Sequence, residues 1–485
     1  MKGKLIFAIL FVLVFTSCGG GGSETDTPTE ASPTATTPAP TVAETTTTPE
    51  PTPEPIVYPD LGGRVVRFGS QAMYWAQSVG AHNEEVGWVI PGPDDAMDAH
   101  MRYENRLRVE ELFNIVIEPV YIPGGEIMDR LTTSHLAGEN YVDLFYISPP
   151  TVLNAYKRGL ILPIDDLLRP DSDVLNEQLY MWSGVTVDGN LLGVTRPIPV
   201  FNQQGIFVNM DIIEALGLPN PVDLFNNGEW TWEAMRNIIS QATTGEYFGF
   251  GGPLGAFTVN LIASNGTTIM NPNTLELNFD TPQVMAAIEF VTGIIDNNWF
   301  FVPDPSAEDY LIAGANTTSF IHQKTALNFV NGTAGINAER NAAGGTLPMQ
   351  FNWLPMPIGP NNTVGTTFSN NGRDNEGVVF GAEDPEVLFW ILEELFKWSG
   401  EEYWIEHEAD HDWARNWAPD EATVQRLANN GRNMVIDLGP MTVMGGGYFN
   451  SMILAHYNGE MTVAQFIEQN RAEREQMRRD WFGLD

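Results

Sequence analysis

The segment YWIEHEADHDW contains HEADH, the H-E-x-x-H spacing that binds zinc in many metalloproteases. In a helix, His407 and His411 would lie one turn apart on one face, where both imidazoles could bind Zn²⁺ while Glu408 activates a water molecule. However, Glu406 and Asp410 each precede one of the histidines, whereas zinc-protease helices place the motif between uncharged residues. No second motif supplies a third ligand. We expect no bound metal, and an exported zinc hydrolase stays the alternative.

Other catalytic signatures do not occur in the chain. The glycine-rich run GFGGPLG at 249–255 lacks the G-x-G-x-x-G spacing, and neither a G-x-S-x-G motif nor an EF-hand loop is present. The 62 acidic residues provide carboxylate pairs by chance, so a glycoside hydrolase also stays an open alternative. We therefore expect a protein that is not an enzyme and has no cofactor.

The amino-terminus has the pattern of an export signal, with Lys2 and Lys4 before the apolar run Leu5–Phe15. Eleven apolar residues are too few for a permanent membrane span. Small residues before Cys18 resemble a bacterial lipobox, which predicts cleavage after residue 17 and lipidation of Cys18, for example with palmitate. Because Cys18 is the only cysteine, no disulfide can form within the chain. Ordinary cleavage with an incidental thiol is the alternative.

Residues 18–56 are rich in Thr, Pro and Glu and carry no Lys or Arg. Such a composition cannot bury a core, so we expect a disordered tether that could extend to about 100 Å. The net charge of −38 argues against nucleic-acid binding, because phosphates require a basic face. The remaining residues are sufficient for two globular domains.

Strand-like and helix-like segments alternate along the chain, which predicts a mostly parallel α/β architecture in two lobes. Thr281 and Pro282 mark a helix start, and the apolar residues that follow recur at helical spacing. The predicted strands are 63–68, 115–120, 143–147, 204–209, 325–330, 351–357 and 377–381. The predicted helices are 95–114, 126–138, 151–159, 211–217, 232–242, 282–297 and 385–399.

The order of these segments resembles the extracellular solute-binding proteins of carbohydrate ABC importers, the maltodextrin-binding-protein-like family 1. The resemblance extends from about Gly63 to the carboxyl terminus. It is carried by YVDLFYISPPTVLNAYKRGLILPIDDLL, VTVDGNLLGVTRPIPVFNQQGIFVNMDII, LPNPVDLFNNGEWTWEAM, HQKTALNFVNG, FNWLPMPIGPNN and AEDPEVLFWILEEL. None of these segments is decisive alone, but together they keep the family order behind a lipobox.

The resemblance implies a type II periplasmic-binding-protein-like fold with a hinged ligand cleft. It places 57–199 and about 372–415 in the first lobe, and 204–370 and about 416–485 in the second. It also implies a monomer that captures a carbohydrate and delivers it to the permease subunits of an ABC transporter. With the lipid anchor, the protein would stand on the outer face of the bacterial cytoplasmic membrane.

A sugar site needs flat aromatic rings and polar side chains, and in α/β folds these follow the strand ends. The alternatives at these positions are core packing, plain turns, hinge structure or a surface ion pair. The predicted ligand-binding residues are Gln71, Tyr74, Trp75, Ser148, Phe201, Asn202, Gln203, Asn265, Asn331, Arg373, Trp413, Trp417 and Tyr448.

Overall fold

The computed structural model describes residues 56–484 apart from 71–78, 81, 84–86, 94–96, 173–185, 188, 195–202, 272–273, 302–323, 331–346, 371–374, 400–413, 416, 432 and 445–446. The predicted leader, Cys18 and nearly all of the predicted tether thus lie outside the described residues. No helix in the described part is long and apolar enough to cross a membrane.

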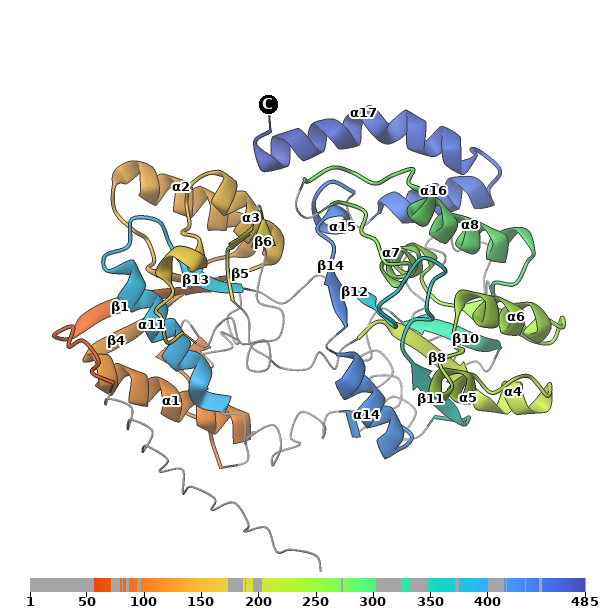
Figure 1. Ribbon diagram of the computed structural model, residues 1–485, viewed down its shortest axis with the longest axis horizontal. Helices are drawn as coiled ribbons and strands as arrows, with labels where there is room; N and C mark the ends of the chain where they lie inside the picture. Colours follow the sequence, from red (N-terminus) through yellow and green to blue (C-terminus); the bar gives the residue numbers. More distant parts are fainter. Residues whose placement is uncertain are drawn as a thin grey trace, which may run out of the picture. The chain divides into compact units, whose positions relative to one another are not determined.

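The first lobe is built on a four-stranded sheet in the order β13-β5-β1-β4 (Figure 1). Its strands are β1 (Arg64–Ser70), β4 (Ile115–Tyr121), β5 (Leu144–Ile147) and β13 (Asn375–Val378). β1 pairs in parallel with β4 and β5, whereas β13 is antiparallel to β5. The chain therefore returns to this sheet about 230 residues after leaving β5, which a local sequence pattern cannot reveal.

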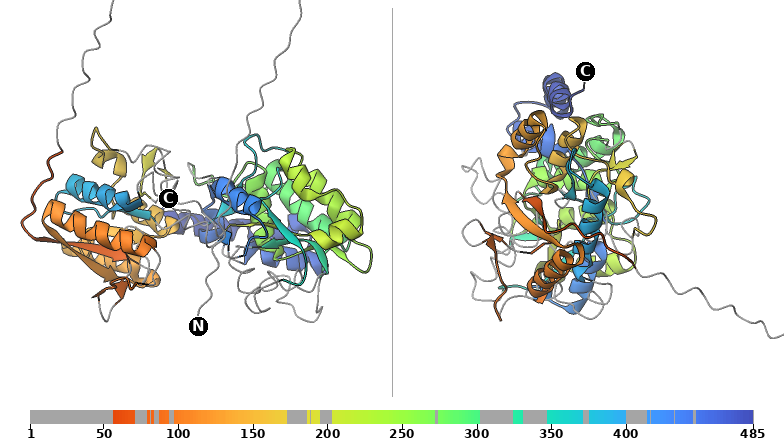
Figure 2. Two further views of the ribbon diagram at one scale, coloured as in Figure 1. Left: turned by 90° about the horizontal axis from the view of Figure 1, so that it is seen from below. Right: turned by 90° about the vertical axis from the view of Figure 1, so that its left-hand side faces the viewer.

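Helices lie on both faces of this sheet. α1 (Met97–Phe113) and α11 (Pro385–Phe396) pack side by side along one face, as both views in Figure 2 show. α2 (Ile127–Ala137) and α3 (Pro149–Lys157) lie toward the other face (Figure 1). α2 ends at Gly138, which has the left-handed conformation that favours glycine. Short elements complete the lobe: β2 (His82–Asn83), β3 (Gly87–Trp88), η1 (Gly124–Glu126), η2 (Ile164–Leu167), β6 (Thr186–Val187), β7 (Asn190–Leu191) and η4 (Lys397–Ser399).

The second lobe contains a four-stranded sheet in the order β11-β8-β10-β9. Its strands are β8 (Gly205–Asn209), β9 (Phe248–Gly251), β10 (Thr325–Val330) and β11 (Phe351–Leu354). β8 is antiparallel to β10 and β11, and β10 is parallel to β9. Every residue of β8 and β10 is buried, so both faces of the sheet are covered.

Capped helices surround the second sheet. Thr231 caps α6 (Trp232–Ala242), and Thr281 caps α8 (Pro282–Asp296). The sequence predicts the second of these caps. The other helices of this lobe are α4 (Met210–Ala215), α5 (Pro221–Asn226), α7 (Leu254–Ser264), α14 (Glu421–Asn430), α15 (Gly439–Thr442), α16 (Tyr448–Tyr457) and α17 (Val463–Phe482). The strand pair β12 (Phe368–Asn370) and β14 (Met434–Ile436) packs beside α7.

The sequence-based elements largely agree with the structure. The observed strand β11 ends at Leu354 and is therefore shorter than the predicted strand 351–357. The predicted strand 377–381 corresponds to β13, which begins earlier, at Asn375. The predicted helix 385–399 is α11 followed by a 3₁₀ turn. α7, α14, α16 and α17 were not predicted from the sequence. The exact lobe boundaries stay a prediction, because the predicted boundaries at 199–204, 370–372 and about 415–416 include residues outside the described part of the chain.

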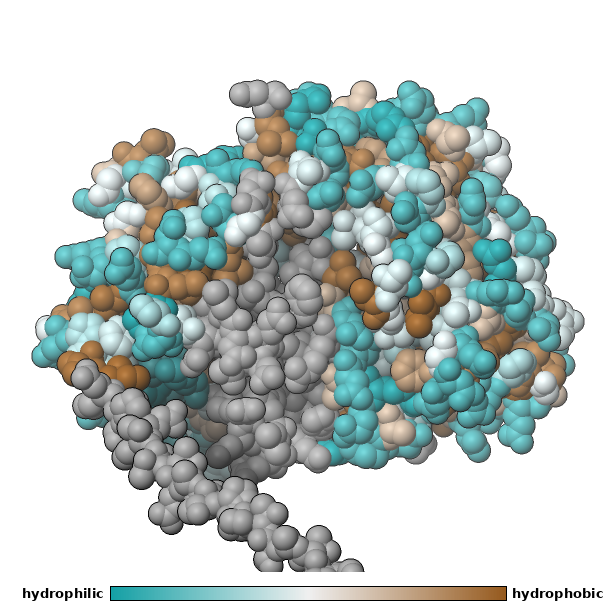
Figure 3. All heavy atoms as spheres, viewed as in Figure 1, coloured by the Kyte–Doolittle hydropathy of each residue, from teal (hydrophilic) through white to brown (hydrophobic). Residues whose placement is uncertain are grey.

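The described surface facing the viewer in Figure 3 is mainly hydrophilic, with scattered hydrophobic residues between. This distribution agrees with a chain that carries a large excess of acidic residues.

Candidate functional site

The carboxyl ends of β1 and β5 meet at one edge of the first sheet, because the two strands are parallel. β1 ends at the buried Ser70, and β5 ends at Ile147, directly before Ser148. Asn375 of β13 pairs with Ile147 and is fully buried at the same edge. Three polar residues from distant parts of the chain are therefore gathered where α/β folds bind ligands.

Ser148 stands at the start of α3, where its hydroxyl lies 2.9 Å from the Thr151 hydroxyl. Its side chain makes no capping hydrogen bond to the helix. Pro149 and Pro150 occupy the first helical positions and have no N–H, so this helix start lacks two of the donors that usually hold an anion. The hydroxyl pair is therefore better suited to a neutral ligand with hydroxyl groups than to a phosphate.

Asn375 was not predicted from the sequence as a site residue, although it follows the predicted Arg373 by two positions. Its close approach to the backbone at Gly193 requires glycine, since a Cβ at residue 193 would lie 2.7 Å from the Asn375 Cβ. The adjacency to Arg373 was the only sequence signal for this position.

In the second sheet, the parallel strands β9 and β10 also end at one edge. β9 runs through Gly251 into Gly252, whose φ of +109° and close contact with Phe329 suit only glycine. A Cβ at residue 252 would lie 2.3 Å from the Phe329 carbonyl oxygen. The GFGGPLG run thus serves a close strand-to-helix turn before α7, and not the phosphate loop that its spacing had already excluded.

Of the predicted ligand-binding residues, only Ser148 is described at a strand-end edge with a partly accessible side chain. The following predicted residues lie outside the described part of the chain: Gln71, Tyr74, Trp75, Phe201, Asn202, Asn331, Arg373 and Trp413. Their predicted roles stay predictions.

Two predicted polar contacts have internal partners instead. Gln203 is fully buried, donates from Nε2 to the Leu427 carbonyl oxygen at 2.6 Å, and accepts from Asn430 Nδ2 at 2.8 Å. Asn265 is also fully buried, and its amide bonds two backbone groups, the Gln283 carbonyl at 3.0 Å and the Asn361 N–H at 3.0 Å. Both side chains join parts of the second lobe, so this conformation does not support them as ligand contacts.

The predicted stacking residues Trp417 and Tyr448 also lie in the apolar core. Trp417 is 2% exposed and packs edge-on against Phe207, with ring centroids 5.7 Å apart. Tyr448 is 5% exposed and contacts the rings of Phe449 and Phe466, each with a centroid distance of 5.3 Å. Burial raises the pKa of the Tyr448 hydroxyl to about 12. Neither ring has a free face for a sugar in this conformation, which corrects the interpretation of both as stacking platforms.

No group of three or more His, Cys, Asp and Glu side chains within the described residues is placed to hold a metal ion. His407 and His411 lie outside those residues. The zinc hypothesis therefore gains no structural support.

Comparisons with known proteins place the chain in a wider context. A family model described as bacterial extracellular solute-binding protein matches residues 109–374. The polygalacturonan/rhamnogalacturonan-binding protein YtcQ of Bacillus subtilis (strain 168) is 29% identical over 120 residues, which are 24% of this chain and 24% of that protein. The match thus spans about a quarter of that relative.

Several solved structures have a similar fold, and this chain aligns with nearly the whole length of each. The sugar-binding protein MalE of Xanthomonas citri aligns with a TM-score of 0.59 and 12% identity, covering 86% of this chain and 98% of that one. A family 1 extracellular solute-binding protein of Bifidobacterium longum subsp. infantis aligns with a TM-score of 0.58 and 15% identity, covering 86% of this chain and 100% of that one. The cyclic α-maltosyl-1,6-maltose binding protein of Arthrobacter globiformis aligns with a TM-score of 0.54 and 15% identity, covering 87% of this chain and 99% of that one. At these identities, the likeness shows a shared two-lobed fold.

Proposed function

Because the chain belongs to the family of bacterial extracellular solute-binding proteins, we propose that it is the substrate-binding subunit of an ABC importer. In this proposal, the protein captures a sugar or oligosaccharide between its two lobes and delivers it to a membrane permease. The captured solute is bound and released without any bond being made or broken.

The observation that carries this proposal is the family match over residues 109–374. The matched stretch begins inside α1 and contains strands of both sheets, ending just before β13. It therefore includes β5 and Ser148 of the first edge and both strands of the second edge, β9 and β10, and not one lobe alone. The names of the relative and of the similar structures, which refer to sugars and polysaccharides, support a carbohydrate as the solute.

The chemistry of the first edge supports a neutral polyhydroxyl ligand. A hydroxyl pair such as Ser148 and Thr151 can both donate to and accept from sugar hydroxyls. The missing N–H groups of Pro149 and Pro150 weaken the affinity of the α3 start for anions. We include Trp75 and its neighbours Gln71 and Tyr74 as the proposed stacking and rim groups from the loop after β1.

We further propose that the protein is lipidated at Cys18 and tethered to the outer face of the membrane. After residue 56 the chain is attached to the first lobe by Tyr58, whose ring packs against Phe113 and Trp390 at centroid distances of 5.2 and 5.1 Å. The Tyr58 hydroxyl donates to Glu394 at 3.2 Å. A lipid anchor would therefore pull on a firmly packed part of the first lobe.

A thermal-shift screen of mono- and oligosaccharides, with a polyol and a peptide as alternatives, tests the proposal. A bound ligand raises the melting temperature, because it adds RT ln(1 + [L]/Kd) to the free energy of unfolding. We expect at least one saccharide to raise the transition in a concentration-dependent manner. A response to the polyol or peptide alone would contradict the carbohydrate assignment.

Metal analysis of the same preparation tests the hydrolase alternative. We expect substoichiometric zinc and no hydrolysis of the saccharides. Stoichiometric zinc that is lost together with hydrolytic activity in His407→Ala would overturn the transport proposal.

A further inference from the structure

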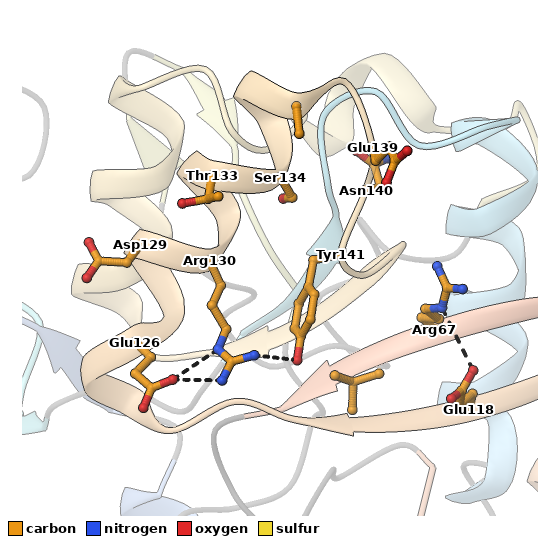
Figure 4. A pocket seen from close by; sticks show the side chains of 12 residues that line it. Arg67, Glu118, Glu126, Asp129, Arg130, Thr133, Ser134, Glu139, Asn140 and Tyr141 are labelled. Carbon is orange, nitrogen blue, oxygen red and sulfur yellow. Dashed lines mark hydrogen bonds and ion pairs between the residues drawn. The ribbon is translucent and has the colours of Figure 1, made fainter.

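A groove of about 820 Å³ lies between α2 and strands β1 and β4 of the first lobe (Figure 4). This volume is in the range of small-molecule sites. The groove is distinct from the strand-end edge described above, because its wall is the length of α2 and its floor includes the middle of β1 and β4. The groove runs along α2, whose 11 residues correspond to a length of about 16 Å.

Two ion pairs and one aromatic ring shape the groove. On the helix side, the Arg130 guanidinium binds the Glu126 carboxylate at 2.8 Å and the Tyr141 hydroxyl at 2.8 Å. On the strand side, Arg67 faces Glu118 at 3.8 Å. Figure 4 shows the Tyr141 ring between these two pairs. The Arg130 interactions fix both the guanidinium and the ring, so the groove contains a preorganised aromatic group.

The strand side offers polar groups that are free for a ligand. Arg67 and Glu118 are paired only through the long Nε contact of 3.8 Å, and about half of each side chain is exposed. Within the described residues, the Asn140 amide and the Glu139 carboxylate have no hydrogen-bond partner in the protein. The groove thus presents a fork of N–H donors, an amide and carboxylate acceptors beside the Tyr141 ring, and such donors and acceptors bind the hydroxyls of a sugar.

The charge of the groove selects against acidic ligands. Four carboxylates line it, from Glu118, Glu126, Asp129 and Glu139, against two guanidinium groups, so the net charge of the lining is 2 − 4 = −2. A polyuronate would meet this negative potential and be repelled, whereas a neutral oligosaccharide would not.

The groove lies one residue along β4 from the edge where we place the main ligand site. Val120, which lines it, is next to Tyr121 at the end of β4, and Tyr121 pairs with Ser70 at the end of β1. We propose that the groove is an accessory carbohydrate subsite, which holds the part of a neutral oligosaccharide that extends beyond the strand ends of the first lobe. This inference rests on the proposed function, since it assigns a longer substrate to the same protein.

The test compares chain lengths in a variant that should keep its fold. Arg67→Ala combined with Asn140→Ala removes the free donors but no side-chain hydrogen bond of the described structure, so stability should change little. Arg479→Ala is the matched control, because Arg479 is a partly exposed arginine of α17 that donates to Gln476. Calorimetric titration of the full chain uses neutral malto-, galacto- and xylo-oligosaccharides of two to six units, and oligogalacturonides as the acidic probe.

We expect the wild type and Arg479→Ala to bind the hexasaccharide of the preferred neutral series on the order of ten-fold more tightly than the trisaccharide. In the double variant this gain should disappear while trisaccharide binding persists. An unchanged gain in the double variant would overturn the subsite but leave the proposed function intact. Preferential binding of oligogalacturonides would overturn the neutral class. Failure of every saccharide to bind would overturn the proposed function and the subsite together.

Discussion

The Asp437 carboxylate accepts a hydrogen bond from the backbone N–H of Ile269 at 2.5 Å, which joins the end of β14 to the loop after α7. The same carboxylate accepts from the N–H groups of Met270 at 3.3 Å and Gly439 at 3.0 Å. Despite these three donors, complete burial raises the pKa of Asp437 to about 6.

This buried carboxylate predicts a specific dependence of stability on pH. Because the pKa is raised in the folded state, the native protein binds this proton more tightly than the unfolded chain does. Its contribution to stability is therefore full below pH 4 and is lost as the pH rises through about 6, by about 3 kcal/mol. Asp437→Asn should remove this slope. Denaturant unfolding of the wild type and Asp437→Asn from pH 3.5 to 7 should show that the difference between their unfolding free energies changes with pH. Parallel plots of unfolding free energy against pH would contradict the prediction.

Two tryptophans should separate core packing from ligand binding. Trp417→Ala removes a buried ring next to Phe207 and should lower the free energy of unfolding by about 3–5 kcal/mol. Trp75→Ala, at the proposed ligand loop, should weaken saccharide binding with little loss of stability. Denaturation and titration of both variants check this pair. A stable Trp417→Ala protein with lost affinity would restore that residue as a ligand contact.

The hydroxyl pair at the start of α3 should matter for affinity and not for stability. Ser148→Ala removes a hydroxyl that makes no capping bond, so a two- to ten-fold loss of affinity, about 0.5–1.5 kcal/mol, is expected with an unchanged melting temperature. Thr231→Ala is the control, because the Thr231 hydroxyl accepts from the Ala234 N–H at 3.3 Å as a cap of α6. It should cost about 1 kcal/mol of stability without affecting affinity. If Ser148→Ala lowered the melting temperature and left affinity unchanged, Ser148 would not be a ligand contact.

Two glycines with positive φ should differ in their tolerance of a side chain. Gly252→Ala combines backbone strain at φ +109° with a contact of 2.3 Å between the new Cβ and the Phe329 carbonyl oxygen. Because the costs of strain and overpacking add, we expect this substitution to lower the free energy of unfolding by several kcal/mol. Gly245→Ala has a φ of +93° with no atom within 4 Å of its Cβ and should cost about 1–3 kcal/mol. Thermal unfolding measures both, and equal losses would contradict a role for the close approach.

The sequence by itself determined the elements that depend on neighbouring residues. Thr281 and Pro282 predict the start of α8 because capping and the fixed φ of proline act within one turn. The strand and helix alternation and the ordered family segments predicted the two-lobed α/β fold, and the position of Ser148 after a strand predicted its place at a sheet edge. These inferences needed no knowledge of which distant segments meet.

Only the tertiary structure decided which polar and aromatic side chains are accessible. Trp417 and Asn265 have the residue types of a sugar site, but packing from other parts of the chain buries them. Conversely, Arg67 and Glu118 face each other because β1 and β4 pair in register, and α2 places Arg130 beside Tyr141. Burial and long-range pairing depend on contacts between residues far apart in sequence, so residue type and spacing alone do not determine them.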